Sequence, residues 1–308
     1  MKYASYKQIL RFFMIIIVIG GFPLCPASAL PPAAGPRIIL SQSEVAPGHT
    51  LLLEVDTSDA PRAYTRIELS YNEITIPVIE HPSGIEGKFI GLIPIPLSAK
   101  PAKNVVLLKF SDKNSIHTKA VAFTIVSNTF ATEELRIDPA MIILSDDDRR
   151  RVEREWLEVK EIYTDKISAR LWREPFQMPL AGGVTSAFGT KRVFNGTMVS
   201  IHSGVDLRSD IGTPVFAANQ GVVKLAKELF YAGNCVVIDH GMNIFTVYAH
   251  LSVIQVAAGQ SVCKGQQLGL SGATGRVNGP HLHWGARVGG IKVCPIQLSD
   301  VIRKLSEI

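Results

Sequence analysis

The pattern of hydrophobic and polar residues changes twice along the chain. From Arg37 to about Ser127, short runs rich in aliphatic and β-branched residues alternate with turns that contain Pro or Gly. The runs are TLLLEVD, TRIELSY, EITIPVI, KFIGLIPI, NVVLLKF and KAVAFTIV. About six or seven short strands at this spacing are typical of an antiparallel sandwich. Residues 37–127 are therefore predicted to form an Ig-like β-sandwich domain.

A helical pattern follows in the middle of the chain. In SDDDRRRVEREWLEVKEIYTD, apolar residues recur at steps of three and four and form one stripe made of Val152, Trp156, Val159 and Tyr163. Ser145 is a suitable N-cap, and the three aspartates that follow it favour the positive end of a helix. Residues 128–175 are predicted to be a connector that contains a helix over 145–165, with the helix packing on one or both neighbouring domains.

The β pattern returns from about Phe176 and is now rich in glycine turns. Strands and helices do not alternate here, so a parallel nucleotide-binding sheet is excluded. The glycines also lack the Gly-Lys-Ser/Thr ending of a phosphate-binding loop. Residues 176–300 are predicted to form a second β domain. The expected fold is mainly β, with two antiparallel β domains joined by a helical connector.

The first residues read as a targeting segment. A basic start, with Lys2, Lys7 and Arg11, precedes the apolar run Phe12–Leu24 and the small residues of Ala27–Ala29. This order predicts a secretory signal peptide, residues 1–29, cut after Ala29. A membrane anchor is the alternative, but a spanning helix needs about 20 apolar residues and this run is shorter. We expect an exported protein, periplasmic or associated with the cell wall, without a stable membrane anchor after cleavage.

Charge and cysteine content narrow the class further. The chain of 308 residues carries a net charge of +5, and loss of three basic residues with the leader lowers it to +2. No large cationic field remains, so nucleic acid is not an expected partner. Three cysteines remain in the mature chain, too few for a disulfide scaffold. If one bridge forms, Cys263 with Cys294 is the expected pair, and Cys235 is expected to be a small buried residue.

Two short motifs in the second β domain carry candidate metal ligands. HSGVDL places His202 four residues before Asp206, and Gly204 between them would let the chain bend so that both reach one ion. In HLH, the alternation of a strand directs His281 and His283 to one face. Histidine nitrogens and a carboxylate oxygen are usual zinc ligands, and three protein ligands leave a position for water. Spacing alone does not decide whether His281 or His283 is the third ligand.

The remaining histidines divide into two groups. His250, in VYAHL, is expected to end a strand of the same domain and to lie beside the metal ligands. Together with the non-ligand histidine of HLH, it could orient a water, stabilise an oxyanion and transfer a proton. His240, in an apparent hairpin turn, is interpreted as structural. The scattered histidines of the first domain, His49, His81 and His117, are expected to have no site role.

The motifs HSGVDL, YAHL and GPHLHW occur in the order and glycine setting of the lysostaphin-type (LytM-like) zinc metallopeptidases. The chain resembles this family from about Phe176 to Pro295. The resemblance implies one bound zinc ion, Zn2+, with the ligands His202, Asp206 and His283. It also implies catalytic roles for His250 and His281, which would not bind the metal.

The family cleaves the peptide part of bacterial peptidoglycan. The resemblance therefore implies an exported zinc endopeptidase that hydrolyses peptidoglycan crosslinks with a metal-activated water. The bond stays open: D-Ala to diaminopimelate crosslinks are expected in a host with a periplasm, and glycine bridges in one with a thick wall. One alternative is a non-catalytic regulator that activates another wall hydrolase as its protein partner. Such relatives usually lack a ligand, whereas this chain lacks none.

A zinc-binding or adhesion module is a third alternative, but it leaves two of the histidines without a role. The chain also departs from the family pattern at two places. Trp284–Arg287 lacks a common glutamate, and Cys235 replaces a larger residue. By its position before the connector, the first domain is expected to inhibit the peptidase domain or to position its substrate.

Overall fold

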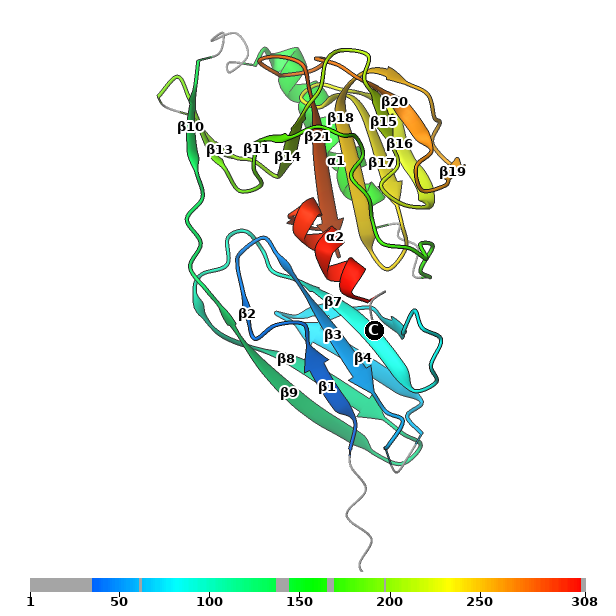
Figure 1. The fold of residues 1–308 in the computed structure, drawn as a ribbon. Coiled ribbons are helices and arrows are strands. Elements are labelled where there is room, and N and C mark those ends of the chain that lie inside the picture. Colours follow the sequence, from blue (N-terminus) through cyan, green and yellow to red (C-terminus); the bar gives the residue numbers. More distant parts are fainter. Residues whose placement is uncertain (1–34, 61–62, 137–143, 165–168, 197, 306–308) are drawn as a thin grey trace, which may run out of the picture. The chain divides into compact units, whose positions relative to one another are not determined.

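The computed structural model describes residues 35–60, 63–136, 144–164, 169–196 and 198–305, which all lie in one compact unit, residues 34–308. The predicted signal peptide, residues 1–29, lies outside the described residues. Strands dominate the described part, with two helices (Figure 1). No described helix has both the length and the apolar character needed to cross a membrane. The prediction of a mainly β protein is confirmed.

Two sheets lie in the first part of the chain, and both contribute to one hydrophobic core. The first sheet contains, in spatial order, β1 (Arg37–Leu40), β3 (Thr50–Asp56), β7 (Lys88–Pro94) and β6 (Val78–Glu80). The second contains β2 (Glu44–Val45), β9 (Ile116–Ile125), β8 (Ala102–Ser111), β4 (Arg66–Tyr71) and β5 (Ile74–Ile76). Antiparallel pairing dominates, with β2 and β9 parallel. The Ig-like topology stays a prediction.

One predicted strand of this region is two strands in the structure. The run EITIPVI separates at Pro77, so that β5 joins the five-stranded sheet and β6 joins the four-stranded one. Proline has no backbone N–H to donate to a strand ladder, which makes it a natural point for the chain to leave a sheet. The apolar pattern continues through Pro77 because both sheets bury side chains in the same core.

A ten-stranded sheet forms most of the second part of the chain. Its main path runs through β11 (Val184–Ser186), β14 (Gly204–Arg208), β21 (His281–Val288), β18 (Ile244–Ile254), β17 (Gly233–Asp239), β16 (Gly221–Leu229) and β19 (Ser261–Val262). Beside this path lie β15 (Pro214–Phe216), β20 (Gln267–Ser271) and β22 (Ile291–Val293). All these pairings are antiparallel.

The two strands that carry the HSGVDL and HLH motifs, β14 and β21, lie side by side and have one buried face. Val205 and Leu207 of β14 and Leu282 and Trp284 of β21 are each no more than 2% exposed. The side chains between them therefore point to the other face of the sheet, since a strand alternates with a period of two. Asp206, His281 and His283 lie on that other face.

A short strand of the connector joins the second part of the chain. β10 (Thr132–Leu135) pairs in parallel with β12 (Lys191–Phe194), which pairs in turn with β13 (Met198–Ile201) (Figure 1). The sequence TEEL has two adjacent glutamates and no alternation, so the pattern does not predict this strand. Its parallel partner lies far along the chain, and the pairing places Glu133 opposite Arg192.

Helix α1 (Asp146–Ile162) begins at Ser145, whose Oγ accepts a hydrogen bond from the backbone N–H of Asp148 at 3.1 Å. Its apolar side packs on the sheet through Val159, Ile162 and Tyr163, which contact a cluster from β16, β17 and β18. Trp156 is 59% exposed and no residue of the helix is fully buried, so fewer residues of the apolar stripe pack on the sheet than the spacing predicts. The apolar contact with the sheet lies at the C-terminal end of the helix, whereas Glu155 accepts a hydrogen bond from the backbone N–H of Phe230 at 2.7 Å nearer its middle.

A second helix, α2 (Pro295–Lys304), ends the described chain and is not among the predicted elements. Pro295 begins it, where a missing N–H costs no helical hydrogen bond. Leu298, Val301 and Ile302 are buried. Gln297 bonds both backbone groups of Thr50 in β3, at 2.8 Å to its N–H and 2.9 Å to its carbonyl. The helix thus connects the last residues of the described chain to the first β region.

Cys263 and Cys294, the pair expected if one bridge forms, are not bridged in the structure. Both are free thiols, as is Cys235, the third cysteine of the described residues. Cys263 lies exposed in the turn after β19, whereas Cys294 is half-buried as the N-cap residue of α2. The prediction assumed only that an oxidising compartment permits a bridge, and the chain holds these two residues in separate elements. Cys235 is buried, as expected for a small apolar residue.

His240, which the sequence suggested to be structural, lies fully buried below the sheet. Its Nδ1 donates to the Gln220 carbonyl at 2.8 Å, and its Nε2 lies 2.7 Å from Thr246 Oγ1. Burial lowers the pKa of His240 to about 4, although the bond to Gln220 opposes the shift. The unfolded chain has an ordinary histidine, with a pKa of about 6.5.

This difference predicts an acid-sensitive fold. Between pH 6.5 and 4 the unfolded chain binds a proton at His240 and the folded chain does not, so stability falls as pH falls through this window. On lowering the pH from 7 to 4.5, His240 alone should reduce the free energy of unfolding by about 2–3 kcal/mol. In His240→Gln this loss should be smaller by that amount, as measured by urea unfolding with a metal chelator present. An equal pH dependence in both proteins would contradict the prediction.

Candidate active site

Four adjacent strands bring the candidate residues into one row. The register pairs Ser186 of β11 with Asp206 of β14, Asp206 with His283 of β21, and His283 with Ala249 of β18. Directly opposite residues of antiparallel strands have Cβ atoms about 4.5–5.5 Å apart. Residues that are far apart in the sequence therefore become neighbours on the open face of the sheet.

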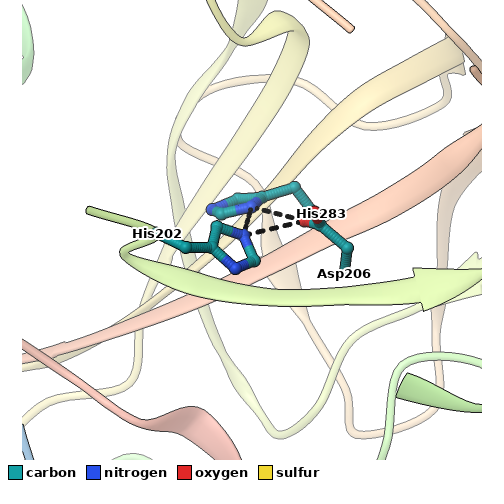
Figure 2. Close-up of side chains that lie close together, drawn as sticks. All are labelled: His202, Asp206 and His283. Carbon is teal, nitrogen blue, oxygen red and sulfur yellow. Dashed lines mark hydrogen bonds and ion pairs between the residues drawn. The ribbon is translucent and has the colours of Figure 1, made fainter. Parts of the chain in front are cut away.

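Three side chains converge on this face, as Figure 2 shows. His202 Nε2 lies 2.9 Å from Asp206 Oδ1 and 3.0 Å from His283 Nδ1, and His283 Nδ1 lies 2.9 Å from Asp206 Oδ1. His202 and Asp206 are buried, at 3% and 4% exposure, and His283 is half-buried. These residues form a group that could hold a metal ion.

The chemistry of the three donor atoms fits a bound cation. His202 Nδ1 lies 2.9 Å from the Ala187 carbonyl, which can only accept, so the ring proton resides on Nδ1 and Nε2 has a lone pair. In neutral rings, at most one proton, on His283 Nδ1, is available for the three mutual contacts. At least one pair of lone pairs would then face each other at 2.9 Å. A cation that accepts all three removes that repulsion, and imidazole and carboxylate together suit divalent first-row metals.

Gly204 has a different role from the bend that the sequence suggested. It begins β14, a regular strand, and lies opposite Gly285 of β21. A Cβ at Gly204 would lie 2.7 Å from both Cε1 and Nε2 of His283. The glycine therefore makes room for the His283 ring. His202 reaches Asp206 because it lies in the residues just before the strand, outside the regular ladder.

His250 lies within β18 rather than at its end, at an irregular point of the strand. Asn234 pairs with Leu251 and Val236 with Tyr248, so β18 has one residue more than β17 in this interval. Such a β-bulge redirects a side chain. His250 also has a φ of 65°, a left-handed conformation that is uncommon outside glycine. The bulge turns the His250 ring to 5.0 Å from that of His281 and 6.0 Å from that of His283.

His250 and His281 are held in the same way. His250 Nδ1 donates to the Thr274 carbonyl and His281 Nδ1 to the Gly279 carbonyl, each at 2.9 Å. In a neutral ring this leaves the Nε2 lone pair available. His281 Nε2 lies 3.7 Å from Asp206 Oδ1, so it borders the three converging side chains without being part of them. The sequence left His281 and His283 equivalent, and the structure separates their positions.

Burial and neighbouring groups shift the pKa values of His250, His283 and Asp206. Burial lowers the pKa of His283, and it lowers the pKa of His250 to about 3. Burial would raise the pKa of Asp206, but the hydrogen bonds and charge that the His202 and His283 rings supply when they are protonated outweigh burial and hold this pKa well below its usual range. At neutral pH the site therefore combines the ionised carboxylate of Asp206 with neutral rings at His250 and His283, and metal binding requires neutral imidazole and ionised carboxylate ligands.

Three further residues lie around the site, Arg192, Ser186 and Glu133, and the sequence suggested none of them. Arg192 Nη2 donates to Asp206 Oδ2 and, at 2.9 Å, to Ser186 Oγ. Ser186 Oγ donates to Glu133 at 3.0 Å, and Arg192 Nε lies 3.5 Å from Glu133 Oε2. Through Arg192, Glu133 thus links β10 of the connector to Asp206, one of the three converging residues. Only the pairing of β10 with β12, which the sequence pattern does not predict, brings it there.

Comparison with known proteins supports the same segment. The family described as Peptidase family M23 matches residues 200–295. The peptidoglycan DD-endopeptidase ShyA of Vibrio cholerae is 48% identical over 125 residues, which are 40% of this chain and 29% of that protein. The DD-carboxypeptidase/endopeptidase Mpg of Neisseria meningitidis is 40% identical over 99 residues, 32% of this chain and 23% of that protein. The chain thus spans less than a third of the length of these relatives.

A solved structure covers more of the chain. A Pseudomonas aeruginosa protein assigned to peptidase M23 superposes with a TM-score of 0.63 and 27% identity, over 83% of this chain and 95% of that one. The match includes residues on both sides of the connector, because it extends well beyond the segment that the family describes. The converging residues His202, Asp206 and His283 all lie within residues 200–295. The chain therefore carries a domain of peptidase family M23.

Proposed function

We propose that the protein is an exported zinc endopeptidase that hydrolyses peptide crosslinks of bacterial peptidoglycan. One observation carries the proposal: three side-chain atoms that could bind a metal converge on the open face of the sheet, and two further histidines border them. A purely structural metal site is closed by four protein ligands. Here three ligand residues and two further histidines fit a site at which a reaction takes place.

In this proposal His202 Nε2, Asp206 Oδ1 and His283 Nδ1 hold the zinc ion. Zinc bound by three protein ligands lowers the pKa of water and polarises a carbonyl oxygen. The protein keeps each ligand in one orientation. The Ala187 carbonyl fixes the His202 ring, and Gly204 leaves the space that the His283 ring occupies.

His250 and His281 would handle protons and charge at the scissile amide. Each has its Nδ1–H committed to a backbone carbonyl, so each presents Nε2 as a base, and as an acid once it has accepted a proton. As an imidazolium, either ring could stabilise a developing oxyanion by hydrogen bonding. The proton could then pass to the amine that leaves. Because burial keeps the His250 pKa near 3, its protonated form is short-lived and returns the proton readily.

Arg192 supports the three proposed metal ligands by holding one of them, Asp206. Its bond to Oδ2 leaves Oδ1 as the oxygen that faces the two ligand histidines. A ligand carboxylate held by a second hydrogen bond keeps its orientation, and loss of such a partner typically weakens metal binding. Ser186 and Glu133 in turn fix Arg192. The connector would therefore have a part in positioning the site, alongside the regulatory or substrate-positioning role expected for the first domain.

The substrate and the location are inferred from the relatives. ShyA is named a peptidoglycan DD-endopeptidase. The segment of this chain that matches the family, residues 200–295, contains the proposed ligands. Peptidoglycan lies outside the cytoplasm, which agrees with the signal peptide predicted at residues 1–29. The competing proposal, a non-catalytic activator of another hydrolase, needs neither His250 nor His281 in their present positions.

The first prediction from the proposed function concerns metal binding. His283→Ala should lower the zinc content of the dialysed protein from about one ion per chain to below about 0.1, because two ligands rarely retain zinc. Elemental analysis by mass spectrometry gives the ratio. His117→Ala, which removes an exposed histidine of β9, is the matched control and should retain the metal. A full zinc content in His283→Ala would refute the ligand assignment.

The second prediction concerns the reaction. The zinc-loaded chain without its predicted signal peptide should release new amino termini from purified peptidoglycan with no other hydrolase present. His281→Gln and His250→Asn should keep the zinc and lower kcat by about 10²–10⁴-fold. Asparagine is chosen at position 250 because it tolerates the left-handed backbone there. If the metal-loaded protein releases no termini, the activator becomes the better proposal.

The third prediction concerns the pair of Arg192 and Glu133. Arg192→Gln should weaken zinc binding by about 10–100-fold, because Asp206 loses the partner of its second oxygen. Glu133→Gln should weaken it less, since Arg192 keeps its bonds to Ser186 and Asp206. Competition with a chelator measures both constants, with Arg303→Gln on α2 as the control. Unchanged affinity in Arg192→Gln would mean that Asp206 needs no such support.

A further inference from the structure

A cleft beside the converging residues has an unusual charge balance. Its volume is about 540 Å³, and Asp206, His250 and His281 are among its lining residues. Three arginines also line it: Arg192, Arg208 and Arg276. Its acidic lining residues are Glu133 and Asp206. A cleft in which cations outnumber acids, beside a metal site, favours an anionic ligand.

Both acids of the cleft are already engaged. Glu133 accepts from Ser186 at 3.0 and 3.2 Å and pairs with Arg192. Asp206 uses Oδ2 for Arg192 and Oδ1 for the two ligand histidines. One arginine is thus neutralised inside this network. The charge of Arg208 is not matched by any carboxylate that lines the cleft.

Arg208 is aimed at the cleft by the same strand that carries a metal ligand. It lies two residues after Asp206 on β14, so both side chains point to the open face of the sheet. Its register partner on β21 is His281, just as His283 is the partner of Asp206. Arg208 is exposed, and within the described part of the chain its guanidinium makes no hydrogen bond or ion pair. The exposed guanidinium of Arg208, beside the proposed catalytic residue His281, is therefore free to bind a ligand.

Arg276 differs from Arg208, because its side chain is held in place. Its guanidinium carbon lies 4.2 Å from the centre of the Tyr231 ring and 5.7 Å from that of Phe194. Stacking on an aromatic ring preserves the positive charge while it fixes the side chain. Arg276 raises the potential of the cleft, and Arg208 is the arginine with its five N–H donors available.

We propose that Arg208 is a specificity residue that binds a carboxylate of the peptide substrate close to the bond that is cleaved. This inference rests on the proposed peptidase function. Two residues along a strand span about 6.6 Å, and an extended peptide advances by about 3.3–3.6 Å per residue. The carboxylate therefore belongs to a residue within about two positions of the scissile amide. A bidentate Arg–carboxylate contact fixes the orientation of the peptide as well as its charge.

The test compares two crosslinked peptides of one sequence. One has free carboxylates on the residues that flank the scissile amide, and in the other these groups are primary amides. The zinc-loaded protein should have a kcat/KM at least about 10-fold higher for the carboxylate peptide, mainly through KM. In Arg208→Gln this ratio should fall to about one. Arg208→Lys should give an intermediate ratio, because an ammonium keeps the charge but not the bidentate geometry.

The matched control is Arg303→Gln, which removes an exposed arginine of α2 and should keep the wild-type ratio. Two results would overturn the proposal. One is a wild-type ratio near one, and the other is an Arg208→Gln variant that loses activity on both peptides equally and so keeps the ratio. The second would indicate a structural role for Arg208.

Calorimetry with the same two peptides separates this proposal from the proposed function. If the wild-type protein cleaves neither peptide, the proposed function fails, and the binding constants alone decide the role of Arg208. Tighter binding of the carboxylate peptide that Arg208→Gln abolishes would support carboxylate recognition by a non-catalytic protein. Equal binding of both peptides would refute it.

Discussion

The site depends on the register between β14 and β21. Because the side chains of a strand alternate with a period of two, a slip of one residue would turn Asp206 into the core and bring Val205 to the open face. Burial of the apolar residues on the other face, Leu207 and Trp284 among them, prevents that slip. The free energy that positions the proposed metal ligands is thus mostly hydrophobic, because burial of the core face fixes which residues lie on the open face.

This dependence explains how far the sequence could predict the site. Alternation alone indicated that His281 and His283 share a face, and the buried Leu282 between them agrees. It could not separate the two roles, because both residues obey the same pattern. Their difference comes from strand partners: His283 lies opposite Asp206 and His281 opposite Arg208. Register across a sheet is a long-range property that a local pattern does not contain.

Other features depended on contacts still further from the local sequence. The bulge that turns His250 arises because β18 has one residue more than its partner, which only the pairing reveals. Glu133 reaches the site through a strand whose sequence resembles a loop. Helix α2, by contrast, carries a local signal that the prediction missed: Pro295 suits the first helical position, and Leu298, Val301, Ile302 and Leu305 recur at helical spacing. The strands of the first β region were easier to predict, since their sequence alternates between turns and apolar runs.

The same burial that shapes the sheet also sets the charges of the site. Desolvation disfavours the charged form of every group, so it lowers the pKa values of His250 and His283 and would raise that of Asp206. Only Asp206 has close partners that favour its charged form strongly enough to reverse the effect. Arg192 orients this carboxylate through Oδ2, while His202 and His283 reverse the effect of burial on its pKa. Within the described residues the Arg208 guanidinium has no acidic partner, so its charge remains available for a ligand.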